Sequence, residues 1–399
     1  MSAPPPPETP PLSGTPSPGE EQIIGIGAAP ADITLDLGEL HPSSHGAMRV
    51  RCSFVEAGPD DDDIVRVAAA EPMPGLLHRG TEKLLEVRDY RAGLMLANRH
   101  DWLSAVTSEV TMALAVEELL GLTPPPRATW LRTLLCEMNR VMAGLMHLAG
   151  AATLPGRGVS AAEVPGMAAR EAWQRALERI SGGRIHAMIT RIGGLANDAP
   201  GGWFDDVRAA VTATREQLPA LTELAITAVS GDHVAALSHD DAVAYSVSGP
   251  VARASGLDID LRRDSPTLAY SDLADVLRVV VRNEGDAAAR YAVLAEQIGY
   301  DLDVIEACID RIPDGDVNVQ LPKVVRAPEG SAYAWLEAAT GINGVLVVST
   351  GETTPWRVRL RTASYANVQA MSAALPGTAL ADLPGAIGSF MFIVGDLDH

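Results

Sequence analysis

Cysteine is scarce in this chain, and the positions of its cysteines limit the chemistry that thiols can supply. The 399 residues include three cysteines, Cys52, Cys136 and Cys308, and no two of them form a Cys-x-x-Cys pair. Three widely separated thiols do not make a disulfide framework, and they suit a reducing cytoplasm. Because iron–sulfur clusters are held by grouped cysteine ligands, the sequence predicts that this chain binds no cluster of its own.

Aromatic residues, basic residues and long apolar runs are also in short supply. Aromatics make up 4% of the chain against 47% hydrophobic residues, so small aliphatic side chains must form a core of closely packed helices. The net charge of −20 argues against binding to nucleic acid and against electrostatic attachment to anionic lipid. No apolar run approaches the roughly 18–20 residues that span a bilayer, so membrane contact would pass through a partner subunit.

Composition and hydrophobic periodicity divide the chain into four parts. Residues 1–21 are rich in proline and serine and lack an apolar core, which predicts a disordered tail rather than a signal peptide. Residues 22–100 form a β-containing region, residues 101–330 a helical bundle, and residues 331–399 a β-hairpin region packed on the bundle. The sequence therefore predicts a mainly α fold with small β-sheets from both chain ends.

Individual elements follow from the same patterns. Alternating hydrophobicity predicts four strands, at residues 49–55, 64–70, 344–349 and 356–361. Helical spacing predicts three long helices, at residues 127–150, 203–229 and 286–312. The last of these should be the longest helix, and Pro219 should kink or divide the second.

A compact turn near the N-terminus carries two histidines. Pro42 and Gly46 flank two serines, which places His41 and His45 on a turn rather than on a helix face. Two imidazoles held in this way could serve proton transfer, metal binding or anion contact. The alternative is that they only make hydrogen bonds within a packed loop. A metal site would lack further ligands at a recognisable spacing, so none is predicted.

This turn is the first of several motifs that follow one another along the chain. The main ones lie at residues 41–46, 77–83, 99–102, 181–186 and 395–398. Together they resemble the quinone-site subunit of respiratory complex I, the 49 kDa subunit family of NADH-quinone oxidoreductase, and the chain is similar to a divergent bacterial paralogue. That family is related to the large subunit of nickel–iron hydrogenases, so the resemblance implies a helical bundle of the hydrogenase-large-subunit kind. Without paired cysteines, a nickel–iron centre is excluded.

The resemblance implies a quinone headgroup near the terminal iron–sulfur cluster of a partner subunit. In the family, a histidine matching His45 and a tyrosine matching Trp102 contact the headgroup, so these two are the predicted catalytic residues. Trp102 can donate through its indole N–H but, unlike a phenol, has no exchangeable acid near physiological pH. Leu154 stands where the family has an aspartate that partners the histidine, and Gly144 stands where it usually has another histidine. The departures therefore gather at the proton-delivery end of the site.

Four further residues are predicted to face a cofactor. Arg99 and His186 match an arginine and a histidine that face the partner's cluster in the family, and Arg79 matches an arginine of the basic turn. His41 completes this set. The arginines have a structural alternative, which is pairing with nearby carboxylates, namely Glu82, Glu86 or Asp101.

The resemblance also implies an assembly. Expected partners are the iron–sulfur subunit that carries the terminal cluster, other peripheral-arm subunits, and a membrane subunit that forms the quinone entry. Quinone would be the substrate, NADH would be used by the holo-complex, and the chain would sit peripherally on the cytoplasmic side of the bacterial cell membrane. It would act as a subunit of an oxidoreductase and translocase. The alternative is a redox-silent scaffold that keeps the fold and partner surfaces but has lost quinone protonation.

Overall fold

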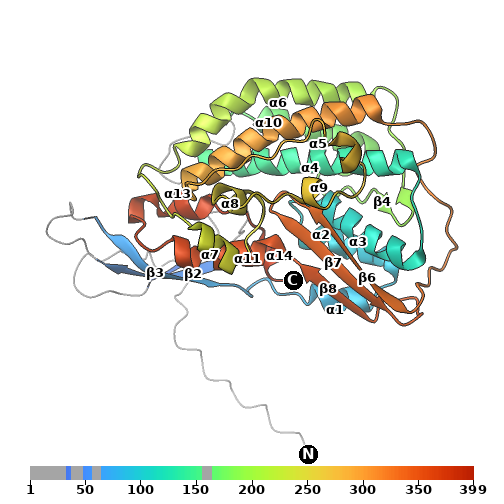
Figure 1. The fold of residues 1–399 in the computed structure, drawn as a ribbon, viewed down its shortest axis with the longest axis horizontal. Coiled ribbons are helices and arrows are strands. Elements are labelled where there is room, and N and C mark those ends of the chain that lie inside the picture. Colours follow the sequence, from blue (N-terminus) through green and yellow to red (C-terminus); the bar gives the residue numbers. More distant parts are fainter. Residues whose placement is uncertain (1–32, 37–47, 56–63, 155–163) are drawn as a thin grey trace, which may run out of the picture.

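The computed structural model describes residues 33–36, 48–55, 64–154 and 164–399. The described part is mainly helical and carries one three-stranded sheet near each end of the chain (Figure 1). This confirms the predicted fold class, mainly α with small β-sheets from both chain ends. The predicted tail, both histidines of the N-terminal turn, His41 and His45, and the acidic run at 60–63 lie outside the described residues.

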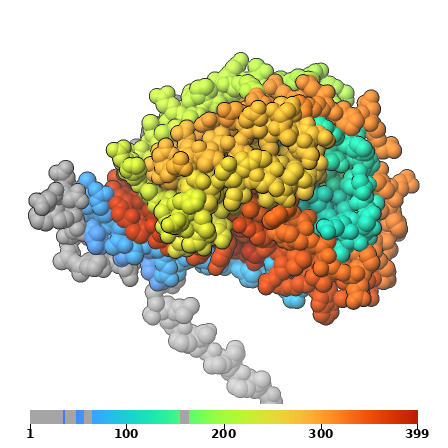
Figure 2. All heavy atoms as spheres, viewed as in Figure 1, coloured from blue at the N-terminus to red at the C-terminus, as the bar shows by residue number. Residues whose placement is uncertain are grey.

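The N-terminal sheet is antiparallel in the order β1-β2-β3, and its strands are β1 (Ile33–Asp36), β2 (Arg49–Val55) and β3 (Arg66–Met73). Alternate side chains of β2 are buried, namely Val50, Cys52 and Phe54. Both predicted strands are therefore confirmed. In Figure 2 this sheet, in blue, projects at one end of the molecule and touches the C-terminal segment, in red. These two parts share a hydrophobic core with residues 234–252 and Ala287.

Two helices follow before the bundle begins, α1 (Thr81–Glu86) and α2 (Tyr90–His100). Asp89 caps α2 by accepting the backbone N–H of Ala92 at 2.8 Å, which starts this helix early. Arg99 lies in the last turn of α2, and Trp102 lies in the turn between α2 and α3.

Five helices make the bundle: α3 (Ala105–Leu120), α4 (Pro126–Ala152), α5 (Met167–Ser181), α6 (Trp203–Ile226) and α10 (Ala287–Arg311). In Figure 1, α6 and α10 run side by side along the edge of the molecule, and both pack against α4. The predicted long helices are confirmed, although α4, with 27 residues, exceeds α10, with 25. Pro219 does not divide α6, because it lies on the exposed face, where the carbonyl it leaves unpaired can meet water.

Short elements connect these helices. They are the strands β4 (Thr190–Arg191) and β5 (Gly194–Leu195), the helices α7 (His239–Ala244), α8 (Gly249–Ala254) and α9 (Leu261–Asp264), and the 3-10 helix η1 (Tyr270–Leu273). Gly194 shows why one of these turns needs glycine. Its φ is +145°, and an added Cβ would lie 2.1 Å from the carbonyl oxygen of Val317.

The C-terminal region has more structure than the predicted hairpin. Its antiparallel sheet contains β6 (Gly330–Glu337), β7 (Ile342–Ser349) and β8 (Arg357–Arg361). The hairpin is the β7–β8 half, and β6 was missed because its small side chains alternate weakly. Short helices end the chain, namely α11 (Ala363–Gln369), α12 (Met371–Ala374), η2 (Leu380–Asp382), α13 (Leu383–Gly388) and α14 (Val394–Leu397).

The few aromatic residues of the bundle core are placed where their polar atoms are satisfied. Trp173 donates its indole N–H to Thr214 Oγ1 at 2.8 Å, and Trp203 donates to the carbonyl of Ala176 at 2.7 Å. Both side chains are fully buried. These bonds fix α5 against α6. None of the helices in the described ranges is both long enough and apolar enough to cross a membrane.

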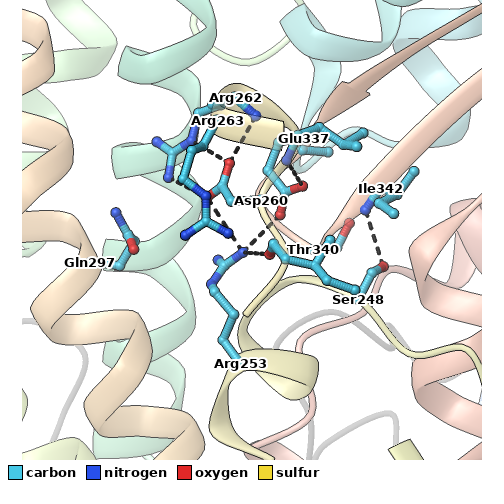
Figure 3. A network of polar contacts seen from close by, with 12 residues as sticks. Ser248, Arg253, Asp260, Arg262, Arg263, Gln297, Glu337, Thr340 and Ile342 are labelled. Atoms are coloured by element: carbon cyan, nitrogen blue, oxygen red, sulfur yellow. Dashed lines mark hydrogen bonds and ion pairs between the residues drawn. The ribbon is translucent and has the colours of Figure 1, made fainter. Parts of the chain in front are cut away.

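A buried network of ion pairs joins the bundle to the C-terminal sheet. Arg262 of α9 is fully buried and contacts three carboxylates, Asp260 and Asp301 at 2.7 Å each and Glu137 at 2.9 Å. Arg253 of α8 lies 2.9 Å from Glu337 of β6 and 3.5 Å from Asp260. Figure 3 shows Arg253, Asp260, Arg262 and Glu337 converging from separate elements. The network therefore ties α4, α8, α9, α10 and β6 to one another.

This network contains one more carboxylate than arginine, so ion pairing alone does not neutralise it. It contains three arginines and four carboxylates, namely Arg140, Arg253 and Arg262 with Glu137, Asp260, Asp301 and Glu337. Although burial opposes it, the guanidinium of Arg262 lowers the pKa of Asp260. Burial and the charge of Asp260 raise the pKa of Glu337, so Glu337 is the member that favours a bound proton.

Removing one buried cation should therefore be costly. Arg262→Met removes the cation that three buried carboxylates share and leaves Glu137 and Asp260 with only the longer ion-pair contacts to Arg140 and Arg253. We therefore expect the free energy of unfolding to fall by about 3–5 kcal/mol. The matched control is the neighbouring Arg263→Met, because Arg263 is exposed and pairs at the surface with Asp258 and Asp264. That change should cost less than about 1 kcal/mol. Urea unfolding of the full-length variants measures both, and equal losses would contradict a central role for the network.

Candidate functional site

Arg79 sits in a loop that the C-terminus holds in place. Asp398 accepts the backbone N–H groups of Gly75 at 2.7 Å and Leu77 at 2.8 Å, and the backbone carbonyl of Asp398 lies 3.1 Å from His78 Nδ1. Arg79 itself is exposed, with its guanidinium beside Gly395 of α14. The last residues of the chain thus position the basic turn.

The expected pairing of Arg79 with the acids of α1 is not formed. Glu82 and Glu86 instead pair with arginines of β8. Arg357 lies 2.8 Å from Glu86 and 3.1 Å from Glu82, and Arg359 lies 3.2 Å from Glu82. Among the described residues, Arg79 makes no ion pair. The structural alternative is therefore wrong for this arginine, and its guanidinium remains accessible.

Arg99 and His186 lie together, as predicted for a cofactor-facing pair. His186 Nδ1 is 2.5 Å from Asn98 Oδ1, and Arg99 Nη1 is 3.3 Å from the sulfur of Met188. Because the oxygen of Asn98 can only accept, Nδ1 of His186 carries the proton, and Nε2 is the ring atom left to accept. Arg99 is exposed and forms no pair with Asp101 in the described structure.

Glu109 of α3 organises this pair, and the sequence analysis missed it. Its buried carboxylate accepts the backbone N–H groups of Met188 at 2.9 Å and Thr190 at 3.0 Å, and also the side-chain amide of Asn98. These bonds hold Met188 at a positive φ of 48°, which aims the 186–190 segment toward Arg99. Burial raises the pKa of Glu109 even so. A carboxylate on the apolar part of a helix is the signal that could have identified it.

The electrostatics keep His186 neutral near physiological pH. Burial lowers the pKa of His186, and the positive charge of Arg99 lowers it further. The pair therefore presents one fixed cation and one neutral imidazole. Beside it lies a groove of about 720 Å³, bordered by Arg91, Met95, Met188 and Arg191.

Trp102 stands apart from this groove. It is half-buried and borders a small cavity together with Leu103, Arg170 and Ile185. The cavity has a volume of about 10 Å³, which is close to the size of a single water probe. Trp102 is therefore not among the residues that border the groove beside the Arg99–His186 pair.

The two other positions named for the site are apolar and tightly packed. Leu154 is buried, and its side chain faces Gly388 of α13. At Gly144 an added Cβ would lie 2.8 Å from Ile298 Cδ1, because α4 and α10 approach closely there. An ionisable side chain at position 144 would therefore require repacking of α4 against α10.

The three cysteines are all buried. Burial raises the pKa of the Cys52 thiol to about 11 and that of Cys136 to about 12. Within the described ranges, no group of three or more His, Cys, Asp and Glu side chains is arranged to hold a metal ion.

Comparison with known proteins gives consistent matches over nearly the whole chain. The family described as respiratory-chain NADH dehydrogenase, 49 Kd subunit, matches residues 158–326 and 320–399. An NADH-quinone oxidoreductase subunit of Streptomyces coelicolor is 47% identical, covering 96% of this chain and 100% of that protein. An NADH-quinone oxidoreductase subunit of Salinispora tropica is 49% identical, covering 95% and 97%.

A solved structure agrees with these matches. A chain of the membrane-bound sulfane sulfur reductase, an archaeal respiratory membrane complex, is similar with a TM-score of 0.82 and 30% sequence identity. The match covers 93% of this chain and 98% of that one.

The coupling between Arg99 and His186 gives a direct prediction. Arg99→Met removes the nearby positive charge, so the pKa of His186 should rise toward its ordinary value. An NMR titration of the His186 ring in labelled protein measures the change. Arg91→Met, on the same helix but bonded to the carbonyls of Pro322 and Lys323, is the control and should leave the titration unchanged. An unmoved His186 in Arg99→Met would show that the two groups are not coupled.

Proposed function

This chain belongs to the respiratory-chain NADH dehydrogenase 49 kDa subunit family, and on that premise we propose that it forms one wall of a quinone cavity. As a member of that family it is a subunit of NADH-quinone oxidoreductase, an oxidoreductase complex of the respiratory chain. In the proposal the cavity lies next to the terminal iron–sulfur cluster of a partner subunit. Quinone is the substrate, and NADH enters the reaction through the holo-complex.

The arrangement of Arg99 and His186 is the observation that carries the proposal. A scaffold has no need to hold a guanidinium and a neutral imidazole close together. Asn98 nevertheless fixes the His186 ring, and buried Glu109 fixes the backbone of Met188, whose sulfur contacts Arg99. A cation near an iron–sulfur cluster raises its reduction potential by stabilising the added electron. In the proposal these two residues face the partner's cluster.

The groove beside Arg99 fits the same orientation. Met95 and Met188 give it an apolar surface, and Arg91 and Arg191 give it positive charge. A surface of this kind suits contact with another subunit, and the iron–sulfur subunit is the partner proposed for it. The membrane subunit that admits the quinone tail, together with other peripheral-arm subunits, completes the proposed assembly. Its position is peripheral, on the cytoplasmic side of the bacterial cell membrane.

Within the cavity the remaining residues have defined roles in the proposal. Two-electron reduction of quinone takes up two protons, so donors must reach its oxygens. His45 contacts the headgroup, and the Trp102 indole shapes the pocket or donates one hydrogen bond. Arg79 and His41 are the remaining residues that we propose face a cofactor.

A second candidate function rests on a specific observation. Trp102 and Leu154 offer no exchangeable acid, and the buried aliphatic side chain of Leu154 cannot hold a histidine by hydrogen bonding. The chain could on this basis be a redox-silent scaffold that keeps the fold and the partner surfaces. Retention of the Arg99–His186 pair favours the quinone-site function over this candidate.

Quinone reduction by the purified assembly separates the two functions. In a working site, His45→Ala should lower the rate at least about a hundredfold by removing a headgroup contact that serves proton transfer, while Trp102→Tyr should keep or raise it. A water-soluble electron acceptor that bypasses quinone is the control for electron delivery. A wild-type assembly that is inert toward quinone, although its cluster reduces normally, would establish the scaffold. Unchanged activity in Arg99→Met would also support the scaffold.

A further inference from the structure

Two carboxyl groups and an imidazole are buried together next to Trp102 in the chain. His100 ends α2, Asp101 follows it, and Asp396 comes from α14 near the C-terminus. Their exposed fractions are 2%, 0% and 1%. His100 Nε2 lies 3.6 Å from Asp396 Oδ1, so residues almost three hundred positions apart meet in the interior.

The tautomer of His100 makes this contact unusual. His100 Nδ1 lies 2.7 Å from the backbone carbonyl of Ala97, and because a carbonyl can only accept, Nδ1 carries the proton. In neutral His100 the other nitrogen, Nε2, therefore has a lone pair directed at Asp396. Two acceptors facing each other in the interior repel unless a proton lies on one of them.

Each carboxyl group also has one oxygen that nothing satisfies. Asp101 Oδ1 accepts the N–H of Ser104 at 2.9 Å, and Asp396 Oδ2 accepts the N–H of Ser364 at 3.1 Å. Asp101 Oδ2 and Asp396 Oδ1 have no hydrogen-bond partner in the described part of the chain. A buried, ionised carboxylate with a bare oxygen is strongly unfavourable, and the usual remedy is to bind a proton.

The nearby positive groups of the described structure do not neutralise these carboxyl groups by ion pairing. The positive or titratable groups that face the three residues are Arg79, Arg361 and His399. Arg79 is exposed, and Arg361 donates to Ile342 and Ser248. In the described structure none of them forms an ion pair with Asp101 or Asp396.

We propose that His100, Asp101 and Asp396 form a proton store that supplies one proton to the quinone reaction. This inference rests on the quinone-site function proposed above. Quinone, two electrons from the donor through the partner's cluster and two protons give quinol. The store provides one of those protons: an O–H bond of its carboxyl group breaks, its electron pair stays on the carboxylate, and an O–H bond forms on a quinone oxygen. Solvent then returns a proton to the carboxylate.

The proton affinities agree with this role. Burial raises the pKa of Asp101 to about 7, with the charge of Asp396 adding to it, and burial also raises the pKa of Asp396. Burial lowers the pKa of His100. The Asp101 carboxyl group can therefore bind and release a proton near neutral pH, where a general acid is most effective. An acid at this position compensates for the indole of Trp102, which cannot release one.

Infrared spectroscopy on the assembled complex tests the store itself. A protonated carboxylic acid has a C=O stretching band that an amide or an ionised carboxylate lacks. We expect wild type to show this band and Asp101→Asn and Asp396→Asn each to lose intensity from it, whereas the exposed-acid control Asp314→Asn should match wild type. An unchanged band in both buried-site variants would overturn the proposal.

Reduction of a short-chain quinone by the same complexes tests the role of the store. The wild-type rate should fall as pH rises through about 7, because the acid form is lost, and each asparagine variant should be at least about tenfold slower with a flattened pH profile. His100→Gln should slow quinone reduction without removing either carboxyl group. Reduction of an acceptor that bypasses quinone should remain at the wild-type rate, which excludes misfolding. Wild-type rates and pH profiles in all three variants would overturn the proposal.

The two measurements separate failure of the store from failure of the proposed function. If the wild-type complex reduces quinone but the variants behave like it, the store is wrong and the quinone site stands. If the wild-type complex reduces no quinone, the proposed function fails and with it the role of the store. In that case, loss of band intensity in the two asparagine variants would still support a proton bound at these residues. Full intensity in both variants would show that no proton is bound there.

Discussion

The burial of Arg262 among three carboxylates is the constraint on which the rest of the structure depends. Each ion in this network would be expensive to bury alone, and the attraction between partners offsets that cost only when every member is placed correctly. The contacts of Arg262 with Glu137, Asp260 and Asp301 join α4, α9 and α10 at one point. Alternative packings of these helices would leave a charge unpaired, so the network selects one arrangement.

The segments of the candidate site are likewise positioned by buried polar groups rather than by apolar packing. Glu109 fixes Asn98 and the segment that holds His186, and Asp398 fixes the loop that holds Arg79. In each case a carboxylate accepts backbone N–H groups from a distant segment. Such bonds define positions more sharply than aliphatic packing does, and a chain whose core is mostly alanine, valine and leucine depends on them for that reason.

The same principle connects the site to the C-terminus. Asp396 and Asp398 lie two residues apart at the end of the chain, and they contact opposite ends of the 75–101 segment. Asp398 accepts a hydrogen bond from Leu77, and Asp396 lies beside His100. Asp398 is fully hydrogen-bonded and structural, whereas Asp396 is left with an unsatisfied oxygen facing an imidazole. A carboxyl group whose oxygens are all hydrogen-bonded serves the structure, whereas one with an oxygen left without a hydrogen bond is available for proton chemistry.

Sequence patterns identified the elements with strong periodicity and the residues with distinctive chemistry. The strands at 49–55 and 344–349 and the long helix α4 follow from hydrophobic spacing, because each buries one regular face or is buried all round. Arg99 and His186 were named in advance, and the structure brings them together.

What escaped prediction depends on distant partners. β6 has weak alternation and exists because it pairs with β7. Asn98 and Glu109 look like ordinary helical residues until the fold brings them to His186. Asp101 was expected to pair with a surface arginine, and it is buried because α14 closes over it. No local pattern encodes such meetings between separated segments.

The proposed quinone site requires Arg99 and His186 to face the partner's iron–sulfur cluster at one end of a quinone cavity. The decisive measurement is a structure of the assembled complex with a quinone-site ligand bound. We expect the partner's cluster opposite the Arg99–His186 pair and the ligand headgroup between His45 and Trp102. A cluster lying against another face of the chain, or a ligand that contacts neither His45 nor Trp102, would contradict it.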